Sequence, residues 1–245
     1  MTIDSIKKNL KEIRRQIKLS CSKTNRGFDE IKLEVVTKGV PPEIIKEIPR
    51  LGLNLFGENR IRQTQINRNY FSSENEIHMI GHLDTNDASK AVELYDAIES
   101  LDSLRLAEKL NYQARQRHKV MPVFLQLKTD LQLTKHGFVK EEIIDAAARI
   151  TLMPHLKIFG LMTLPPLADD PENSRPYFQK LRTTAEEIER ALRAPLPYLS
   201  MGTSQDFTIA IEEGANIIRL GRSVFGFPFP YETTSTFVKK QTQRN

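Results

Sequence analysis

The stretch IKLEVVTKGVPPEIIKEIPRLGLNLF, residues 31–56, contains one complete unit of the fold that the sequence predicts. Its first part, 31–37, is a short run rich in β-branched and apolar residues, which is typical of a buried strand. Two prolines follow at 41 and 42, where a first helical turn accepts them, and the helical pattern ends at Gly52. A second apolar run at 53–56 predicts the next strand. The segment therefore predicts a strand, a helix and a strand in succession.

The same alternation continues along the chain. We expect eight strands, at 31–37, 53–56, 77–80, 96–100, 122–127, 157–162, 197–200 and 216–220. The helical patterns between them include 58–70, 88–94, 103–118, 139–150, 172–193 and 204–215. Eight such units predict an α/β fold, a single (β/α)8 barrel of the TIM type over residues 1–230, with an open doubly wound sheet as the alternative. The polar residues 231–245 predict a frayed C-terminal tail.

Residues 1–20 predict an extra helix before the barrel. Apolar side chains recur at spacings of three and four, with lysine and arginine between them: Ile3, Ile6, Leu10, Ile13 and Ile17. Such a helix lies either on a membrane surface or against the core of its own domain. The stripe lacks the Trp or Phe that interfacial helices favour, so we expect the structural role.

The composition of the chain argues against several classes of protein function. The 245 residues carry a net charge of +5, and the lysines and arginines are spread along the chain rather than clustered, so we expect no nucleic-acid partner. One cysteine, Cys21, cannot form an internal disulfide. No apolar run or leader pattern indicates a membrane segment or secretion, so we expect a cytoplasmic protein with no membrane partner. No His, Cys and Asp spacing fits a metal site, so we expect none.

The junctions after the seventh and eighth strands combine residue types that bind phosphate, at the rim where barrels gather functional groups. Ser200, Thr203 and Ser204 supply hydroxyls, while Gly202 and Gly221 let the backbone approach an anion. The amides that open the next helices add partial positive charge. Ordinary capping and turn residues would explain either junction alone. The two junctions together predict a phosphate site.

Lys38 directly follows the first strand, so we expect its side chain to point into the barrel mouth. An amine in partly apolar surroundings is suited to forming a Schiff base. An exposed lysine at a strand end is the simpler alternative. A lysine that faces a phosphate site fits pyridoxal phosphate, and it also fits a Schiff-base aldolase.

Arg219, at the end of the last strand, favours the cofactor over the aldolase. An arginine that faces a pyridine nitrogen donates to it but does not easily let it become protonated. The ring is then a poor electron sink, which restrains carbanion chemistry. The alternative roles for Arg219 are a contact with a phosphate or carboxylate, or a salt bridge.

Six segments carry a resemblance to a known family, and they follow the family's order: VTKGVPPEIIKEIPRLGLNLFGENRIRQTQ, HMIGHLDTNDASKAVELYDAIESLDSLRLAEKLN, TKHGF, GLMTLPP, LSMGTSQDFTIAIEEGA and IIRLGRSVFG. From about Val35 to Gly226 the chain resembles the pyridoxal phosphate homeostasis proteins. The barrel of these proteins is similar to the N-terminal domain of alanine racemase. Any one of these segments alone is weak evidence for the family, but six segments in the family's order are specific to it.

The resemblance implies a monomer that holds pyridoxal 5′-phosphate as an internal aldimine on Lys38. It implies that Asn59 lies near the ring, that Arg219 faces the pyridine nitrogen, and that residues 200–204 and 221–223 hold the phosphate. Thr203 and Arg222 depart from the family's usual residues, and an added arginine beside a dianion should favour binding. The full set of expected cofactor-binding residues is Lys38, Asn59, His82, Met162, Ser200, Met201, Gly202, Thr203, Ser204, Arg219, Gly221 and Arg222.

The resemblance also implies a regulator of vitamin B6 and amino-acid homeostasis that is not an enzyme. Its partners would be the cofactor and the proteins that accept it, such as apo-enzymes. An amino-acid racemase-like or decarboxylase enzyme is the alternative, but racemases of this kind take a second acid/base from another domain, and we expect none after Gly226. A third possibility is a regulatory interaction protein that uses the N-terminal helix and the loop at 165–175.

Overall fold

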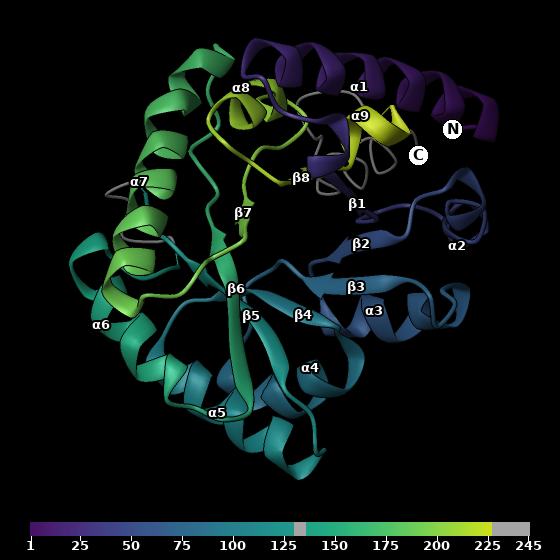
Figure 1. Cartoon of the computed structure of the whole chain (residues 1–245). Helices are drawn as coiled ribbons and strands as arrows, with labels where there is room; N and C mark the ends of the chain where they lie inside the picture. Colours follow the sequence, from purple (N-terminus) through teal and green to yellow (C-terminus); the bar gives the residue numbers. More distant parts are fainter. Residues whose placement is uncertain (130–135, 227–245) are drawn as a thin grey trace, which may run out of the picture.

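A computed structural model describes residues 1–129 and 136–226, and its strands close into a parallel barrel (Figure 1). Each strand pairs with its successor, and β8 pairs with β1 in a register that sets Glu34 beside Arg219. The (β/α)8 barrel is confirmed and the open sheet is excluded. The strands are β1 Lys32–Val36, β2 Leu55–Glu58, β3 Glu76–Met79, β4 Ala97–Leu101, β5 Met121–Gln126, β6 Leu156–Met162, β7 Tyr198–Ser200 and β8 Ile217–Leu220.

Helices surround the barrel and connect its strands (Figure 1). They are α1 Ile3–Lys23, α2 Pro42–Ile45, α3 Ile61–Asn67, α4 Ala88–Leu94, α5 Leu104–Gln116, α6 Lys140–Thr151, α7 Arg175–Leu192, α8 Phe207–Glu212 and α9 Arg222–Phe225. No helix within the described ranges is long and apolar enough to cross a lipid bilayer. The predicted polar tail at 231–245 lies outside the described residues.

The extra N-terminal helix has the structural role that its isoleucine stripe predicts. Helix α1 packs across α8 and α9 (Figure 1) and buries Ile6, Leu10, Ile13 and Ile17. Asn9 Nδ2 also donates a hydrogen bond of 3.0 Å to the carbonyl oxygen of Val224. The helix therefore covers the last helices of the barrel.

At the junctions after β2 and β7, the predicted helices begin later than their sequence pattern suggested. The helix expected from Glu58 begins at Ile61, because Glu58 is the last residue of β2 and its buried carboxylate accepts hydrogen bonds from Thr37 and Asn67. The helix expected from residue 204 begins at Phe207, after a turn over residues 204–206. Both corrections lengthen a strand-to-helix junction, where a barrel carries its functional groups.

The inside of the barrel is filled by side chains of two kinds. Successive residues of a strand point to opposite faces, so alternate positions point inward. One inward group is apolar and packs together: Leu55, Ala97, Phe124, Met162 and Ile217. The other is polar and equally buried: Glu34, His78, Glu99, Ser200 and Arg219. One member of the polar group, Arg219, lines the cavity described next.

Candidate functional site

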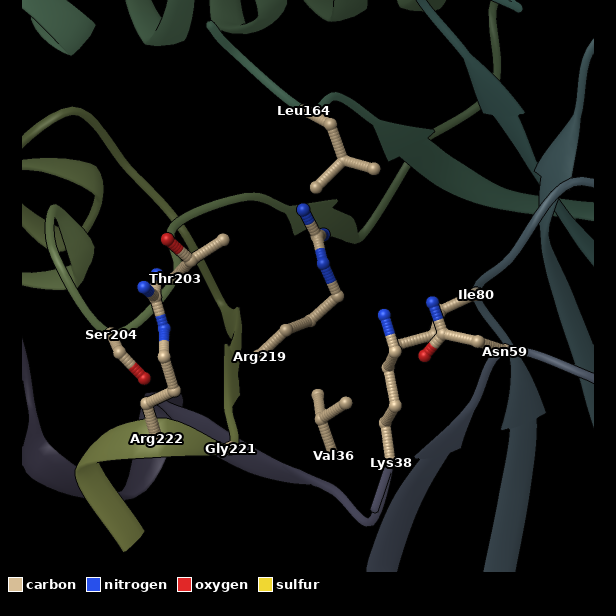
Figure 2. Close-up of a pocket in the computed structure, with 10 residues that line it drawn as sticks. All are labelled: Val36, Lys38, Asn59, Ile80, Leu164, Thr203, Ser204, Arg219, Gly221 and Arg222. Carbon is tan, nitrogen blue, oxygen red and sulfur yellow. The ribbon is translucent and has the colours of Figure 1, made fainter. Parts of the chain in front are cut away.

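A cavity of about 240 Å³ opens among the strand-to-helix junctions of β1, β2, β3, β6, β7 and β8 (Figure 2). The parallel strands bring these distant junctions to one rim, as the barrel architecture requires. The residues that line the cavity are Val36, Lys38, Asn59, Ile80, Leu164, Thr203, Ser204, Arg219, Gly221 and Arg222. The predicted site residues Lys38, Asn59, Thr203, Ser204, Arg219, Gly221 and Arg222 thus meet in one place.

Lys38 and Asn59 extend side by side into the cavity (Figure 2). Val36 pairs with Gly57 in the β1–β2 register, which places these two residues at matching positions beyond the strand ends. A hydrogen bond of 2.5 Å from Thr37 Oγ1 to Glu58 Oε1 ties the two junctions together. Strand pairing and this hydrogen bond thus set the place at which the chain carries Lys38 to the cavity.

Asn59 has an unused acceptor. Its Oδ1 atom is buried and has no hydrogen-bond partner among the described residues. A buried amide oxygen without a partner costs free energy of the order of 1–3 kcal/mol. A ligand with a hydroxyl or N–H donor on this side of the cavity would remove that cost.

The junctions after β7 and β8 form the opposite side of the cavity (Figure 2). Ser223 N donates a hydrogen bond of 3.1 Å to Ser204 Oγ, and Ser223 Oγ donates one of 3.3 Å to the carbonyl oxygen of Ser204. These bonds join the two loops. Thr203 N and Oγ1 instead donate to Asp206 Oδ1, at 2.7 and 3.1 Å. The backbone N–H of Thr203 therefore already has a hydrogen-bond partner within the protein.

Arg222 brings a cation to the same side. Burial lowers the pKa of its guanidinium, and the negative charge of Asp206 acts in the opposite direction. Burial thus penalises a charge that arginine keeps in proteins. An anion in the cavity would offset this penalty through charge-assisted hydrogen bonds.

Arg219 lies between the two sides of the cavity (Figure 2). Its Nη1 atom donates a hydrogen bond of 2.5 Å to Ser200 Oγ, and its Nη2 atom donates one of 2.7 Å to the carbonyl oxygen of Thr163. The side chain is only 3 % exposed, so these two bonds fix the guanidinium in place. A cation is thereby held at the centre of the site.

A buried acidic cluster beneath Arg219 was not predicted from the sequence. Glu99 Oε2 accepts a hydrogen bond of 2.5 Å from Ser200 Oγ, and Glu99 Oε1 lies 2.8 Å from His78 Nδ1. Glu34 Oε1 lies 3.4 Å from the same His78 atom, and neither oxygen of Glu34 has a hydrogen-bond partner among the described residues. The available signal was a glutamate in the middle of each of two short, mainly apolar strands, β1 and β4.

The pKa values of the two carboxyl groups of this cluster shift in opposite directions. Burial, followed by the charge of Glu99, raises the pKa of Glu34 well above the usual value. Burial alone would also raise the pKa of Glu99, but hydrogen bonds and the charges of His78 and Arg219 lower it below that value. Of the two carboxyl groups, Glu34 is thus the one whose surroundings favour the protonated form, whereas those of Glu99, beside Arg219, favour the carboxylate.

Five predicted site residues do not line this cavity, and their part in binding stays a prediction. Ser200 uses its hydroxyl on Glu99 and Arg219, while Met162 and Met201 are buried in apolar packing. Gly202 has a φ of +91°, and a Cβ atom there would lie 2.5 Å from the Cβ of Ala210. This glycine lets the β7 junction approach α8 closely.

His82, the fifth of these residues, lines a neighbouring cavity of about 280 Å³. The two cavities share part of their walls, namely Asn59, Ile80 and Leu164. His82 therefore lines a cavity that adjoins the Lys38 cavity.

The ionisable groups of the Lys38 cavity are all basic. Among the described lining residues they are Lys38, Arg219 and Arg222, with no carboxyl, imidazole, phenol or thiol beside them. The arrangement can hold an anion at Arg222, Ser204 and Gly221 while it presents an amine from the other side. It offers no second acid/base within the described part of the cavity.

Comparison with known proteins identifies the family of this chain. The family described as "Alanine racemase, N-terminal domain" matches residues 36–228. A protein of Aquifex aeolicus named "Pyridoxal phosphate homeostasis protein" is 36 % identical over 220 residues, which cover 89 % of this chain and 96 % of the relative.

Two solved structures have a fold similar to that of this chain. PipY of Synechococcus elongatus PCC7942 with PLP bound is 30 % identical and superposes with a TM-score of 0.76 over 86 % of this chain and 100 % of PipY. An alanine racemase of Clostridium difficile 630 is 17 % identical, with a TM-score of 0.70 over 94 % of this chain but 58 % of the racemase chain. At that identity the racemase supports the barrel fold alone.

Proposed function

Because the chain belongs to the alanine racemase N-terminal domain family, and within it to the pyridoxal phosphate homeostasis proteins, we propose that it binds pyridoxal 5′-phosphate in the Lys38 cavity. Its role is in intracellular homeostasis of that cofactor and of amino acids. The observation that carries this proposal is the Lys38 amine, which extends into a cavity whose far side holds Arg222, Ser204 and Gly221 (Figure 2).

The residues present fit the cofactor. Arg222 and the hydroxyl of Ser204 would hold the phosphate, and Gly221 keeps that side open. A Cβ atom at Gly221 would lie 3.0 Å from the carbonyl oxygen of Val36, so a larger residue would push β1 and β8 apart. The unpartnered Oδ1 atom of Asn59 would accept a hydrogen bond from a donor on the ring.

Arg219 would face the ring with a fixed positive charge. Ser200 and the Thr163 carbonyl hold its guanidinium, and Glu99 Oε2 lies 4.0 Å from Nη1 to balance the charge. Because arginine does not lose its proton in proteins, it would donate a hydrogen bond to a ring nitrogen rather than accept a proton from it.

When bound, the cofactor supplies an aldehyde that condenses with an amine and a ring that can withdraw electrons. We propose that this chain uses the first property and restrains the second. A racemase-like reaction needs acid/base groups on both faces of the ring, and besides Lys38 the ionisable side chains that line the described part of the cavity are the arginines Arg219 and Arg222. The chain is accordingly proposed to be a carrier or regulator rather than an enzyme.

The same proposal covers location and partners. We propose that the protein works in the cytoplasm as a monomer and passes its cofactor to apo-enzymes. The rim position of the Lys38 cavity supports this role, because a bound cofactor would lie near the mouth of the barrel rather than in its core.

Reductive trapping tests the site. Purified protein is mixed with pyridoxal 5′-phosphate, reduced with borohydride and digested, and the modified peptide is identified by mass spectrometry. We expect the label on Lys38, its loss in Lys38→Ala, and wild-type labelling in Lys46→Ala, which removes an exposed lysine of the same β1–β2 connection. A label that stays in Lys38→Ala at the wild-type yield would refute the assignment.

Assays of the loaded protein with L-alanine and other L-amino acids test the racemase alternative. We expect no interconversion of enantiomers and no carbon dioxide release. Turnover that disappears in Lys38→Ala would instead make the chain an enzyme.

A further inference from the structure

Three side chains outside the Lys38 cavity carry metal-ligand chemistry and meet at one point. His82 follows β3, Asp102 follows β4, and His136 follows β5, so they come from three neighbouring junctions of the barrel. Their ring nitrogen and carboxylate oxygen atoms all lie within 4.8 Å of one another. The proposed function uses none of the three in this arrangement.

The distances suit a shared ion. His82 Nδ1 lies 3.2 Å and His136 Nδ1 lies 3.5 Å from Asp102 Oδ2. Ligand atoms that are about 2.0–2.2 Å from a tetrahedral zinc ion lie roughly 3.3–3.6 Å from one another. The carboxylate oxygen is thus already at the separation that it would have from each nitrogen in a zinc site.

The surroundings allow an ion to enter and to be bound. Asp102 is held with 10 % of its side chain exposed, whereas His82 and His136 are 39 % and 51 % exposed. His136 is fixed from behind, because Gln126 Nε2 donates a hydrogen bond of 3.0 Å to its carbonyl oxygen. Asp84 Oδ1 lies 3.8 Å from the other ring nitrogen of His82, on the side where a carboxylate orients a ligating imidazole.

One rearrangement is required. The two imidazole rings stack, with centroids 3.5 Å apart and an interplanar angle of 15°. A metal ion lies in the plane of each imidazole that binds it, so two stacked rings cannot share one ion. One ring must turn about its side-chain bonds, and exposed side chains do this within nanoseconds.

We propose that His82, Asp102 and His136 form a binding site for a divalent transition-metal ion of the zinc class. Two imidazoles and one carboxylate are a ligand set that zinc accepts, with the fourth position left to water. The site would lie beside the Lys38 cavity, since His82 and His136 line the neighbouring cavity that shares Asn59, Ile80 and Leu164 with it.

Calorimetric titration of zinc chloride into the cofactor-free, untagged full-length protein tests the site. We expect one zinc ion per chain, and at least a tenfold loss of affinity in His82→Ala, His136→Ala and Asp102→Asn. His118→Asn is the control, because it removes an exposed histidine elsewhere and asparagine tolerates the positive φ of that position. Equal zinc affinity in wild type and the His82→Ala/His136→Ala double variant would overturn the proposal, as would no binding by wild type.

Cobalt(II) supplies a second measurement. The visible absorption of protein-bound cobalt should appear with wild type and with His118→Asn, and it should be absent from the double variant. Lys38→Ala keeps the whole metal site, so it should bind zinc with wild-type affinity even if the cofactor assignment fails. The two proposals therefore fail separately.

Discussion

Arg219 and Ser200 are joined inside the barrel by a hydrogen bond of 2.5 Å from Nη1 to Oγ. The same hydroxyl donates a hydrogen bond of 2.5 Å to Glu99. Ser200 therefore connects the cation that reaches the cavity to the carboxylate that balances it. A residue expected to hold phosphate from its sequence position has its hydroxyl occupied by these two partners.

Replacing this hydroxyl should destabilise the protein. Ser200→Ala leaves a buried guanidinium N–H and a buried carboxylate oxygen without a partner, and we expect a loss of about 1–3 kcal/mol in the free energy of unfolding. Urea unfolding measures this loss. Ser73→Ala removes an exposed serine and should change the free energy very little. Equal stability of the two variants would show that the Ser200 hydroxyl contributes nothing.

The buried acid Glu34 should make stability depend on pH. Its pKa is raised in the folded protein, so folded chains keep its proton when unfolded chains have lost it. The stabilisation is complete below the ordinary value of 4.5 and is lost as the pH rises from there through the raised pKa. Glu34→Gln has no proton to lose, so its stability should fall less than that of wild type over this range.

Unfolding free energies measured at a series of pH values give this comparison. Glu108→Gln, which alters an exposed glutamate, should follow the wild-type profile. Parallel profiles for wild type and Glu34→Gln would mean that Glu34 already carries its charge in the folded protein.

Arg222 should contribute to affinity for the cofactor. A charge-assisted hydrogen bond contributes about 1.5–3 kcal/mol, so Arg222→Gln should weaken binding by roughly 10–100-fold. Titration of pyridoxal 5′-phosphate into the protein, followed by its absorbance, measures the change. Arg115→Gln alters an exposed arginine of α5 and should bind like wild type. An unchanged dissociation constant in Arg222→Gln would remove this side chain from the phosphate site.

Substitutions at two glycines should distinguish the free-energy cost of backbone strain from that of steric crowding. Both have positive φ, but a Cβ at Gly202 would lie 2.5 Å from Ala210 Cβ, whereas one at Gly52 meets nothing within 4 Å. Gly52→Ala should cost about 1–2 kcal/mol from conformation alone. Gly202→Ala should cost about 1–3 kcal/mol more because the core must shift. Thermal unfolding compares them, and equal losses would indicate that the β7 junction moves freely away from α8.

The sequence by itself determined a parallel α/β fold and the position of its functional rim. Short apolar strands that alternate with helices can bury both of their faces only in a parallel sheet covered by helices, and eight such units favour a closed barrel over an open sheet. Since all parallel strands end at one rim, Lys38, Ser204 and Arg222 could be expected to meet although they are far apart in the chain. The isoleucine stripe of α1 likewise predicted its burial.

Only the tertiary structure decided which side chains touch. Glu34 faces Arg219 because β1 pairs with β8 in one register, and a shift of one residue would turn Glu34 outward. Glu99 and His78, and equally His82, Asp102 and His136, meet because the closed barrel sets neighbouring strands side by side. Strand register and closure are long-range properties, so the local patterns that identify helices and strands do not contain them.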